Sequence, residues 1–297
     1  MFTGLSAFPL TPMSEDQIDE ASYVHLISRL VRAGVDSIGA LGSTGSYAYL
    51  SRGDRARLAK LAVEHAESTP VMVSIGSLRT KHVLELAEDA QKAGVSGVLL
   101  APVSYQVLND SEVFELYRSV TSNLSVPLCV YDNPGTTHFT FSDDLHARIA
   151  QLPNVCSIKI PGVPASHSEA QARVERLRAV IPAHVSIGVS GDASAATGLN
   201  AGCEAWYSVI GGLFPETALA ITRAAQRGDA EEAQRLSSQL LPLWQLFGRC
   251  GGSLRVVAAA AELLNLVSAP SLPLPLKSAE GQVREDLKNL LKLLDLR

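Results

Sequence analysis

Cysteine is scarce in this chain, and the four that occur stand far apart. They are Cys129, Cys156, Cys203 and Cys250, with no C-x-x-C pair among them. This spacing argues against a disulfide framework or a zinc ribbon, and it predicts buried, reduced thiols in a cytoplasmic protein. The seven histidines are equally scattered and form no H-E-x-x-H motif, so we expect no metal site and no cofactor.

Long apolar runs and blocks of positive charge are also missing. No apolar run reaches the ~18 to 20 residues that a membrane-spanning helix needs, and the N-terminal MFTGLSAFPLTPM lacks the pattern of a signal peptide. The net charge is −5, with no basic cluster that would suit a nucleic acid. We therefore expect a small-molecule substrate, with neither a nucleic acid nor a membrane as partner.

Short β-branched runs alternate with amphipathic stretches along most of the chain. In the stretch RTKHVLELAEDAQKA, Val83, Leu86 and Ala90 share one helical face, and Gly94 suits its C-terminal end. The expected strands are 2–6, 35–40, 70–75, 96–100, 127–132, 155–160, 184–189 and 204–209. The expected helices between them are 17–33, 53–66, 79–93, 111–124, 142–151, 165–181, 192–201 and 215–227.

Eight strand–helix pairs in about 225 residues predict an α/β fold, a closed (β/α)8 TIM barrel. An open sheet usually carries G-x-G-x-x-G after its first strand, and this chain does not. We expect residues 1–227 to form the barrel with the active site. Residues 228–297 are then a C-terminal helical extension, with helices near 229–248, 252–266 and 280–295 and a proline-rich link, APSLPLPLK.

One lysine stands among apolar neighbours in VCSIKIPG, residues 155–162. Lysine is seldom buried without compensation, so Lys159 has two interpretations. It could face water from an edge strand, with its stem on apolar surface. Alternatively, it could be an amine kept out of water so that its pKa falls and it becomes a nucleophile.

The active site of such a barrel lies at the C-terminal ends of its strands. Hydroxyl groups, glycines and the lysine gather there, a set that suits a small carboxylate bound by amide N–H and hydroxyl donors. Tight turns alone would also explain the glycines. The segments are GSTGS (42–46), APVSYQ (101–106), YDNPGTTH (131–138), SGD (190–192) and WYSVIGG (206–212).

Tyr131 ends the strand that neighbours the one with Lys159. Many tyrosines at strand ends are packing residues with a hydrated hydroxyl. Next to an amine, however, a phenol can pass protons to and from a carbinolamine. The pairing of these two residue types on adjacent strands favours Lys159 as a nucleophile.

These motifs, in this order, resemble the dihydrodipicolinate synthase / N-acetylneuraminate lyase family of Schiff-base aldolases. The resemblance covers nearly the whole chain and includes FPLTP, GSTGS, YDNPGTT, SIKIPG and SGD. It implies a (β/α)8 barrel with a C-terminal helical extension, in a homotetramer built from two tight dimers. It also implies that Lys159 forms an imine with pyruvate or a related 2-keto acid, that Tyr131 shuttles protons, and that Ser43 links Tyr131 to a hydroxyl relay.

The resemblance assigns a further set of residues to substrate binding. Thr44 and neighbouring backbone N–H groups would hold the pyruvate carboxylate. Tyr207 falls where the eighth strand approaches pyruvate in the family. The full substrate-binding set is Thr44, Gly45, Tyr105, Thr136, Ser190, Gly191 and Tyr207.

Three positions depart from the family pattern. Thr136 stands where dihydrodipicolinate synthases have an arginine that grips the second substrate, and a hydroxyl does not replace a bidentate cation. Ser104 aligns with a family tyrosine of the relay between subunits, with Tyr105 one residue further on. Ile160 replaces a polar residue and is followed by Pro161. The pyruvate half of the site matches the family, whereas the electrophile half differs.

We therefore expect a pyruvate-dependent lyase that makes or cleaves a carbon–carbon bond through a lysine imine, as dihydrodipicolinate synthase does. The alternative is a 2-keto-3-deoxy sugar acid aldolase or dehydratase that uses the same imine. A barrel that binds a keto acid without turning it over is a further alternative, favoured by Ser43 and Ser104. A phosphate site is disfavoured by Asp192, whose carboxylate would repel the anion.

Overall fold

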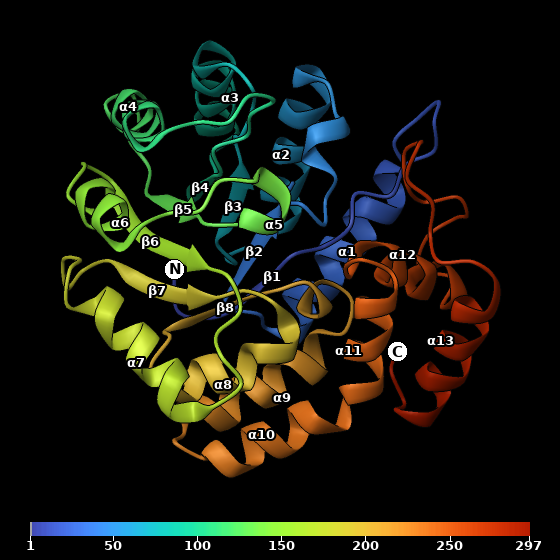
Figure 1. The fold of residues 1–297 in the computed structure, drawn as a ribbon. Helices are drawn as coiled ribbons and strands as arrows, with labels where there is room; N and C mark the ends of the chain where they lie inside the picture. Colours follow the sequence, from blue (N-terminus) through green and yellow to red (C-terminus); the bar gives the residue numbers. More distant parts are fainter. Residues whose placement is uncertain (1) are drawn as a thin grey trace.

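Eight parallel strands close into a barrel in the computed structural model, which describes residues 2–297. The strands follow chain order, and β1 pairs with both β2 and β8, so the sheet has no edge. This confirms the predicted TIM barrel (Figure 1). The strands are β1 (Gly4–Ala7), β2 (Ser37–Ala40), β3 (Val71–Ser74), β4 (Gly97–Leu100), β5 (Leu128–Tyr131), β6 (Val155–Ile160), β7 (Ser186–Val189) and β8 (Ala205–Ser208).

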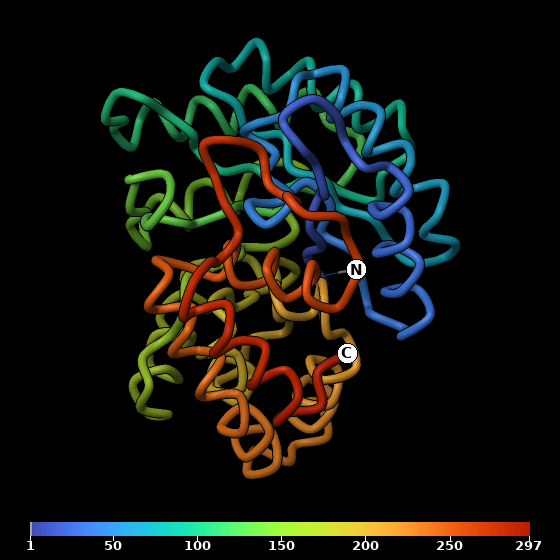
Figure 2. The backbone as a smooth tube through the Cα atoms, turned by 90° about the vertical axis from the view of Figure 1, so that its right-hand side faces the viewer, coloured from blue at the N-terminus to red at the C-terminus, as the bar shows by residue number. Residues whose placement is uncertain are grey.

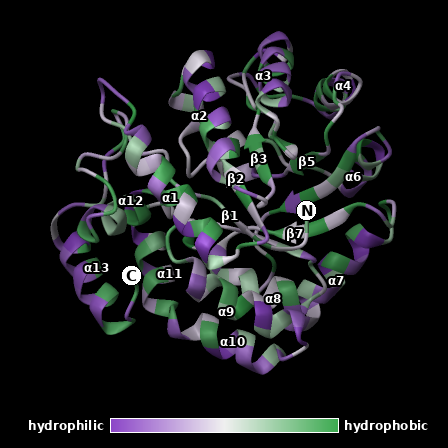
Figure 3. Ribbon diagram, turned by 180° about the vertical axis from the view of Figure 1, so that it is seen from behind, coloured by the Kyte–Doolittle hydropathy of each residue, from purple (hydrophilic) through white to green (hydrophobic). Residues whose placement is uncertain are grey.

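Helices surround the barrel, and their hydrophilic residues lie mainly on the outward sides (Figure 3). Gly34 and Gly94 end α1 and α3 with φ of 76° and 83°, left-handed values that favour glycine. The helices between strands are α1 (Glu20–Ala33), α2 (Arg52–His65), α3 (Thr80–Ala93), α4 (Asp110–Thr121), α6 (Asp143–Ala150), α7 (His167–Arg178) and α8 (Ala195–Asn200), and α9 (Pro215–Gln226) follows β8.

Short helices at the strand ends add to the predicted pattern. They are α5 (Pro134–Thr137) after β5 and three 3₁₀ helices, η1 (Tyr47–Tyr49), η2 (Asp192–Ser194) and η3 (Ile210–Gly212). Each lies directly after a strand or its turn, so together they shape the C-terminal mouth of the barrel. The other predicted barrel elements agree with the structure to within about three residues at their ends.

The C-terminal region contains four helices: α10 (Ala230–Gln239), α11 (Leu241–Arg249), α12 (Leu254–Leu263) and α13 (Gly281–Leu293). The prediction of a single helix over 229–248 is wrong, because the helix is interrupted at Leu240. Pro242 lies in the first turn of α11, where its missing N–H costs nothing, whereas in mid-helix it would remove a hydrogen bond. The division at 227/228 stays a prediction.

The link between α12 and α13 runs beside the N-terminal segment of the chain (Figure 2). The Met13 N–H donates to the Ser271 carbonyl over 3.2 Å. Inside the link region, the buried Glu262 accepts a hydrogen bond from Ser271 Oγ (2.9 Å) and pairs with Arg284 (2.7 Å). The Met13 bond fastens the link to the N-terminal segment, and the Glu262 bonds hold α12, the link and α13 together.

Across residues 2–297, none of the helices is both long enough and apolar enough to span a bilayer.

Two buried apolar clusters divide the core. The larger lies between the strands and the surrounding helices. The smaller fills the barrel interior and consists of Phe2, Phe8, Met72, Leu99, Ala101, Cys129, Tyr131, Ala205 and Tyr207. Because side chains alternate along a strand, the same alternation that buries Tyr131 inside the barrel also directs Lys159, its register partner on β6, to the inside.

Candidate active site

Lys159 lies inside the barrel, enclosed by aromatic rings. Its side chain is only 5% exposed, and β6 pairs with β5 on one side and β7 on the other. The Nζ atom lies 4.0 Å from the ring centroid of Phe8, 4.1 Å from that of Tyr131 and 5.6 Å from that of Tyr207. The structure therefore excludes the interpretation of Lys159 as a solvated lysine on an edge strand.

Burial makes the Lys159 amine more acidic than an ordinary lysine. Loss of hydration lowers its pKa to about 8, although Cys129 and Asp192 act in the opposite direction. With that pKa, about a tenth of the amine is neutral at pH 7, compared with far less than a hundredth for an exposed lysine. A neutral amine in a dry site is the form that attacks a ketone.

Tyr131 faces Lys159 from the neighbouring strand, since the two residues are partners in the β5–β6 register. Burial raises the pKa of Tyr131, opposed by hydrogen bonding to Ser43 and Asn133, so the phenol keeps its proton at neutral pH. Asn133 Nδ2 donates to the Tyr131 hydroxyl over 2.9 Å and lies 3.0 Å from Thr136 Oγ1. The phenol is thus an oriented proton donor beside the amine.

The GSTGS turn after β2 brings Ser43 and Thr44 to the same mouth. Thr44 is buried, and Ser43 is partly buried beside Tyr131. A Cβ at Gly45 would lie 3.0 Å from the Leu41 Cα, so the turn is tight enough to favour glycine. Ser46 has φ of 51°, an uncommon left-handed value for a residue with a side chain. Such local strain is typical of functional turns.

Ser190 and Gly191 lie at the end of β7, next to the end of β6. The Ser190 Oγ donates to the Ile160 carbonyl over 2.8 Å, and Gly191 has φ of 83°. Asp192, in contrast, is turned toward the end of β8. Its carboxylate accepts hydrogen bonds from Trp206 Nε1 (3.0 Å), the Ser208 hydroxyl (3.1 Å) and the backbone N–H groups of residues 209 and 210 (3.1 and 2.8 Å). Asp192 therefore organises the β8 end.

The Tyr207 hydroxyl belongs to a polar network within the barrel. It lies 2.6 Å from Ser157 Oγ and accepts a hydrogen bond from Cys129 Sγ over 3.4 Å. Ser186 Oγ extends the network with a 2.9 Å bond to Ser157. Because the Tyr207 hydroxyl bonds within this network, it is the ring of Tyr207 that faces Lys159.

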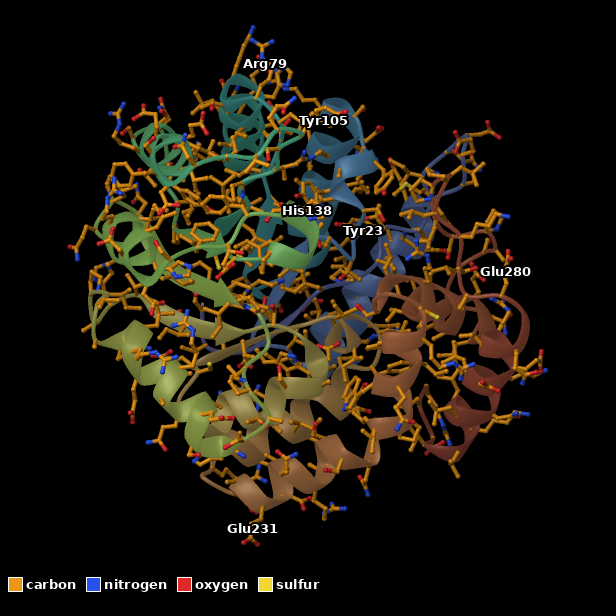
Figure 4. The ribbon with its side chains drawn as sticks, viewed as in Figure 1. Tyr23, Arg79, Tyr105, His138, Glu231 and Glu280 are labelled. Atoms are coloured by element: carbon orange, nitrogen blue, oxygen red, sulfur yellow. The ribbon has the colours of Figure 1, made fainter. Side chains whose placement is uncertain are left out.

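Tyr105 is the candidate that the fold does not bring to the others. It is 90% exposed on the loop between β4 and α4, and it projects from that loop in Figure 4. Thr136 is exposed on α5, which carries it within reach of Asn133. The structure thus brings together Lys159, Tyr131 and Ser43 and leaves Tyr105 on the surface.

A cavity of about 410 Å³ opens on the outer side of the β5 and β6 ends. It begins one residue beyond Lys159, at Ile160 and Pro161, and its polar lining includes Thr140 and Arg173. Asp132 also lines it, and burial raises the pKa of that carboxyl to about 7. The lining of this cavity includes neither Lys159 nor Tyr131, so the cavity is separate from the Lys159 site.

Phe8 and Asn133 contact the reactive groups, although the sequence did not single them out. Phe8 opens the FPLTP motif of the family resemblance, but it is apolar, so a search for polar residues at strand ends assigns it no role. Asn133 lies within the YDNPGTTH segment, and its position two residues after Tyr131 was the available signal.

The arrangement combines a nucleophilic amine, a protonated phenol and a tight turn of hydroxyl and amide donors. These are the groups that imine formation with a small keto acid requires. Among residues 2–297, no three or more histidine, cysteine, aspartate or glutamate side chains are grouped to hold a metal ion.

Comparison with known proteins gives consistent matches over the whole chain. The model of the "Dihydrodipicolinate synthetase family" matches residues 1–294. The 4-hydroxy-tetrahydrodipicolinate synthase of Persephonella marina is 28% identical over 296 residues, covering 98% of each chain. The crystal structure of dihydrodipicolinate synthase from Agrobacterium tumefaciens has a TM-score of 0.94 and 42% identity, covering 99% of this chain and 98% of that one. A putative dihydrodipicolinate synthetase from Pseudomonas aeruginosa has a TM-score of 0.89 and 28% identity, covering 99% and 100%.

Proposed function

The chain belongs to the dihydrodipicolinate synthetase family of pyruvate-dependent Schiff-base lyases, and from this premise we propose that Lys159 is the residue that forms the imine. One observation carries the proposal above the others. The Lys159 amine is buried, has a lowered pKa and lies 4.1 Å from the ring of Tyr131. Few buried lysines in a protein combine these features without a chemical role.

The proposed reaction begins when the neutral Lys159 Nζ attacks the keto carbon of pyruvate. The oxygen of the resulting carbinolamine takes a proton from Tyr131 and leaves as water, which gives a protonated imine. The Tyr131 phenolate left by this transfer takes a proton from the methyl carbon, whose electron pair moves toward the nitrogen to form an enamine. Tyr131 later gives this proton to the oxygen of the aldehyde. The enamine carbon attacks an aldehyde, and hydrolysis of the new imine restores the amine.

The turn after β2 is the proposed site for the pyruvate carboxylate. Thr44 contributes a hydroxyl and Gly45 a backbone N–H, and Ser43 connects Tyr131 to the relay. Ser190 and Gly191 are proposed to line the opposite side of the substrate. Donors that are fixed before substrate binds lower the energy of a developing charge without reorganisation.

Incubation with pyruvate and borohydride tests the proposal. We expect a single added pyruvate-derived group on Lys159, found by mass spectrometry of the digested protein. The pKa of Lys159 is lowered to about 8, so the initial rate of trapping should rise with pH up to about 8 and then level off, because the neutral amine attacks. An unmodified Lys159 peptide would refute the proposed imine.

The electrophile is the part of the reaction where Thr136 matters. Without an arginine at this position, the site lacks the charged clamp that suits a second carboxylate. This favours the alternative of a 2-keto-3-deoxy sugar acid aldolase or dehydratase. A screen of aldehydes and 2-keto-3-deoxy acids for pyruvate consumption or release separates these reactions.

A barrel that only binds keto acids is separated from an enzyme by proton exchange. An enzyme should exchange the methyl protons of pyruvate in deuterated buffer, because the enamine forms and reverts. Thermal stabilisation by pyruvate without exchange would instead support the binding protein.

We also propose a homotetramer built as a dimer of dimers. Tyr49, Leu78, Tyr105 and Val107 are 50%, 64%, 90% and 92% exposed and lie in the successive connections after β2, β3 and β4, with Tyr49 at the end of η1. Large apolar side chains on neighbouring loops are typical of a surface that another subunit covers. The second copy of this chain is the proposed partner.

Light scattering tests the assembly. The native chain should have the mass of four copies, and a Tyr105→Glu, Val107→Glu double variant should give a smaller species with an unchanged circular dichroism spectrum. A control with Leu293→Glu, which is 78% exposed on α13, should keep the native mass. A native chain that is monomeric at micromolar concentration would contradict the proposal.

A cytoplasmic location is proposed on the four cysteines, all of which are free thiols. Fractionation of cells that make the protein would test it.

A further inference from the structure

Phe8 lies against the reactive nitrogen although it carries no chemistry of its own. It follows β1, is 2% exposed and presents its ring face to Lys159 Nζ at 4.0 Å from the centroid. The ring of Tyr131 lies at 4.1 Å from the same atom. The nitrogen is therefore placed over two aromatic faces, at distances typical of cation–π contacts.

The position of the Phe8 ring is fixed by the residues around it. It packs edge-on against Tyr207, with centroids 6.1 Å apart and an interplanar angle of 85°. A Cβ at Gly39 would lie 2.4 Å from this ring, and a Cβ at Gly42 would lie 2.5 Å from it. The glycines of β2 and of the following turn thus leave the space that the ring occupies.

A positive charge at Nζ has little help from carboxylates. Asp192 favours the cation, but four hydrogen-bond donors already engage its oxygens. A carboxylate directly beside the nitrogen would hold the amine protonated and prevent attack. An aromatic face stabilises a cation more weakly and accepts no proton, so it leaves the amine able to deprotonate near neutral pH.

We infer that Phe8 stabilises the protonated imine on Lys159 and holds the nitrogen in register with Tyr131. The inference rests on the proposed function, because the imine cation is the species that the ring would meet. This cation is the electron sink for removal of the methyl proton, so a ring that stabilises it increases the amount of reactive imine present. Phe8 is a positioning residue by this account, and the proton transfers remain with Tyr131.

Graded fluorination of Phe8 tests the inference. Mono-, di- and trifluorophenylalanine keep the shape of the ring and progressively weaken the negative potential of its face. We expect the rate of pyruvate methyl-proton exchange at saturating pyruvate to fall stepwise along this series. The Phe8→Leu variant, which removes the face altogether, should lose about 5- to 30-fold.

Two further readouts separate this effect from a packing defect. The pH midpoint of borohydride trapping should move stepwise to lower values, because each fluorine weakens stabilisation of the ammonium form. The same fluorinated residues at Phe214, which is 2% exposed in the other core cluster, should leave rate and midpoint unchanged. The fluorinated variants still test the inference even if the Phe8→Leu protein fails to fold.

The inference would be overturned if the rate of methyl-proton exchange and the pH midpoint of borohydride trapping both stayed constant along the Phe8 series. That outcome differs from a failure of the proposed function, in which the native protein would give no borohydride adduct on Lys159.

Discussion

Replacing Lys159 with methionine is expected to abolish turnover while the protein stays folded. Methionine keeps a flexible, mostly apolar side chain of similar length, so it should fill the space between Phe8 and Tyr131. It has no amine, and loss of a covalent nucleophile should lower kcat by more than about 10⁴-fold. Borohydride trapping should vanish in the same variant.

The same substitution should leave stability unchanged or increase it. Lys159 is 5% exposed, and burial penalises its charged form. An apolar residue removes that penalty. Thermal unfolding at pH 7 is the measurement, with Lys60→Met as the matched control on the exposed face of α2, where neither activity nor melting temperature should move. Appreciable turnover by the Lys159 variant would rule out an imine at this residue.

Replacing Tyr131 with phenylalanine is expected to lower kcat by about 10²- to 10⁴-fold, the usual contribution of a positioned proton donor. The variant keeps the ring that lies 4.1 Å from Lys159 Nζ and loses only the hydroxyl. Imine trapping should become slow but stay detectable, because the nucleophile is intact. Kinetics of trapping and of turnover, measured on the same preparation, test both expectations.

Tyr117→Phe is the control for this experiment. The Tyr117 hydroxyl is also buried, and it donates to the Leu100 carbonyl over 2.6 Å. Its removal should cost about 1 kcal/mol of stability, the usual value for a buried hydrogen bond, with kcat nearly unchanged. Full activity in the Tyr131 variant would mean that this tyrosine only packs.

The barrel could be predicted because two patterns, the short β-branched runs of strands and the amphipathic spacing of helices, alternate along the chain. Gly34 and Gly94 mark helix ends by a backbone conformation that few other residues adopt, so those boundaries were accessible. The interruption between α10 and α11 at Leu240 could not be predicted in this way, since the apolar pattern continues across it. Only Pro242 signals that the first helix ends there. The one-turn helix α5 is too short for a period to be detected, and it forms from the proline-glycine turn after β5.

The centre of the site was predictable for a related reason. Consecutive strands of a barrel are neighbours, so Lys159 and Tyr131 had to lie close together if both faced inward. The place of Tyr105 depends on the path of an exposed loop, which no pattern in the sequence specifies. Phe8 required knowledge of which ring fills the space above Gly39, a packing property that involves three separate segments of the chain.

The groups around Lys159 come from the strands or their immediate ends, whereas Thr136 and His138 belong to α5 and the residue that follows it. In Figure 4 His138 lies near the centre of the mouth. The exposed Thr136 and His138 lie outside both buried apolar clusters of the core. Under the proposed function, we therefore expect the choice of aldehyde to be altered by substitutions at this rim, without any change to the residues that surround the nitrogen.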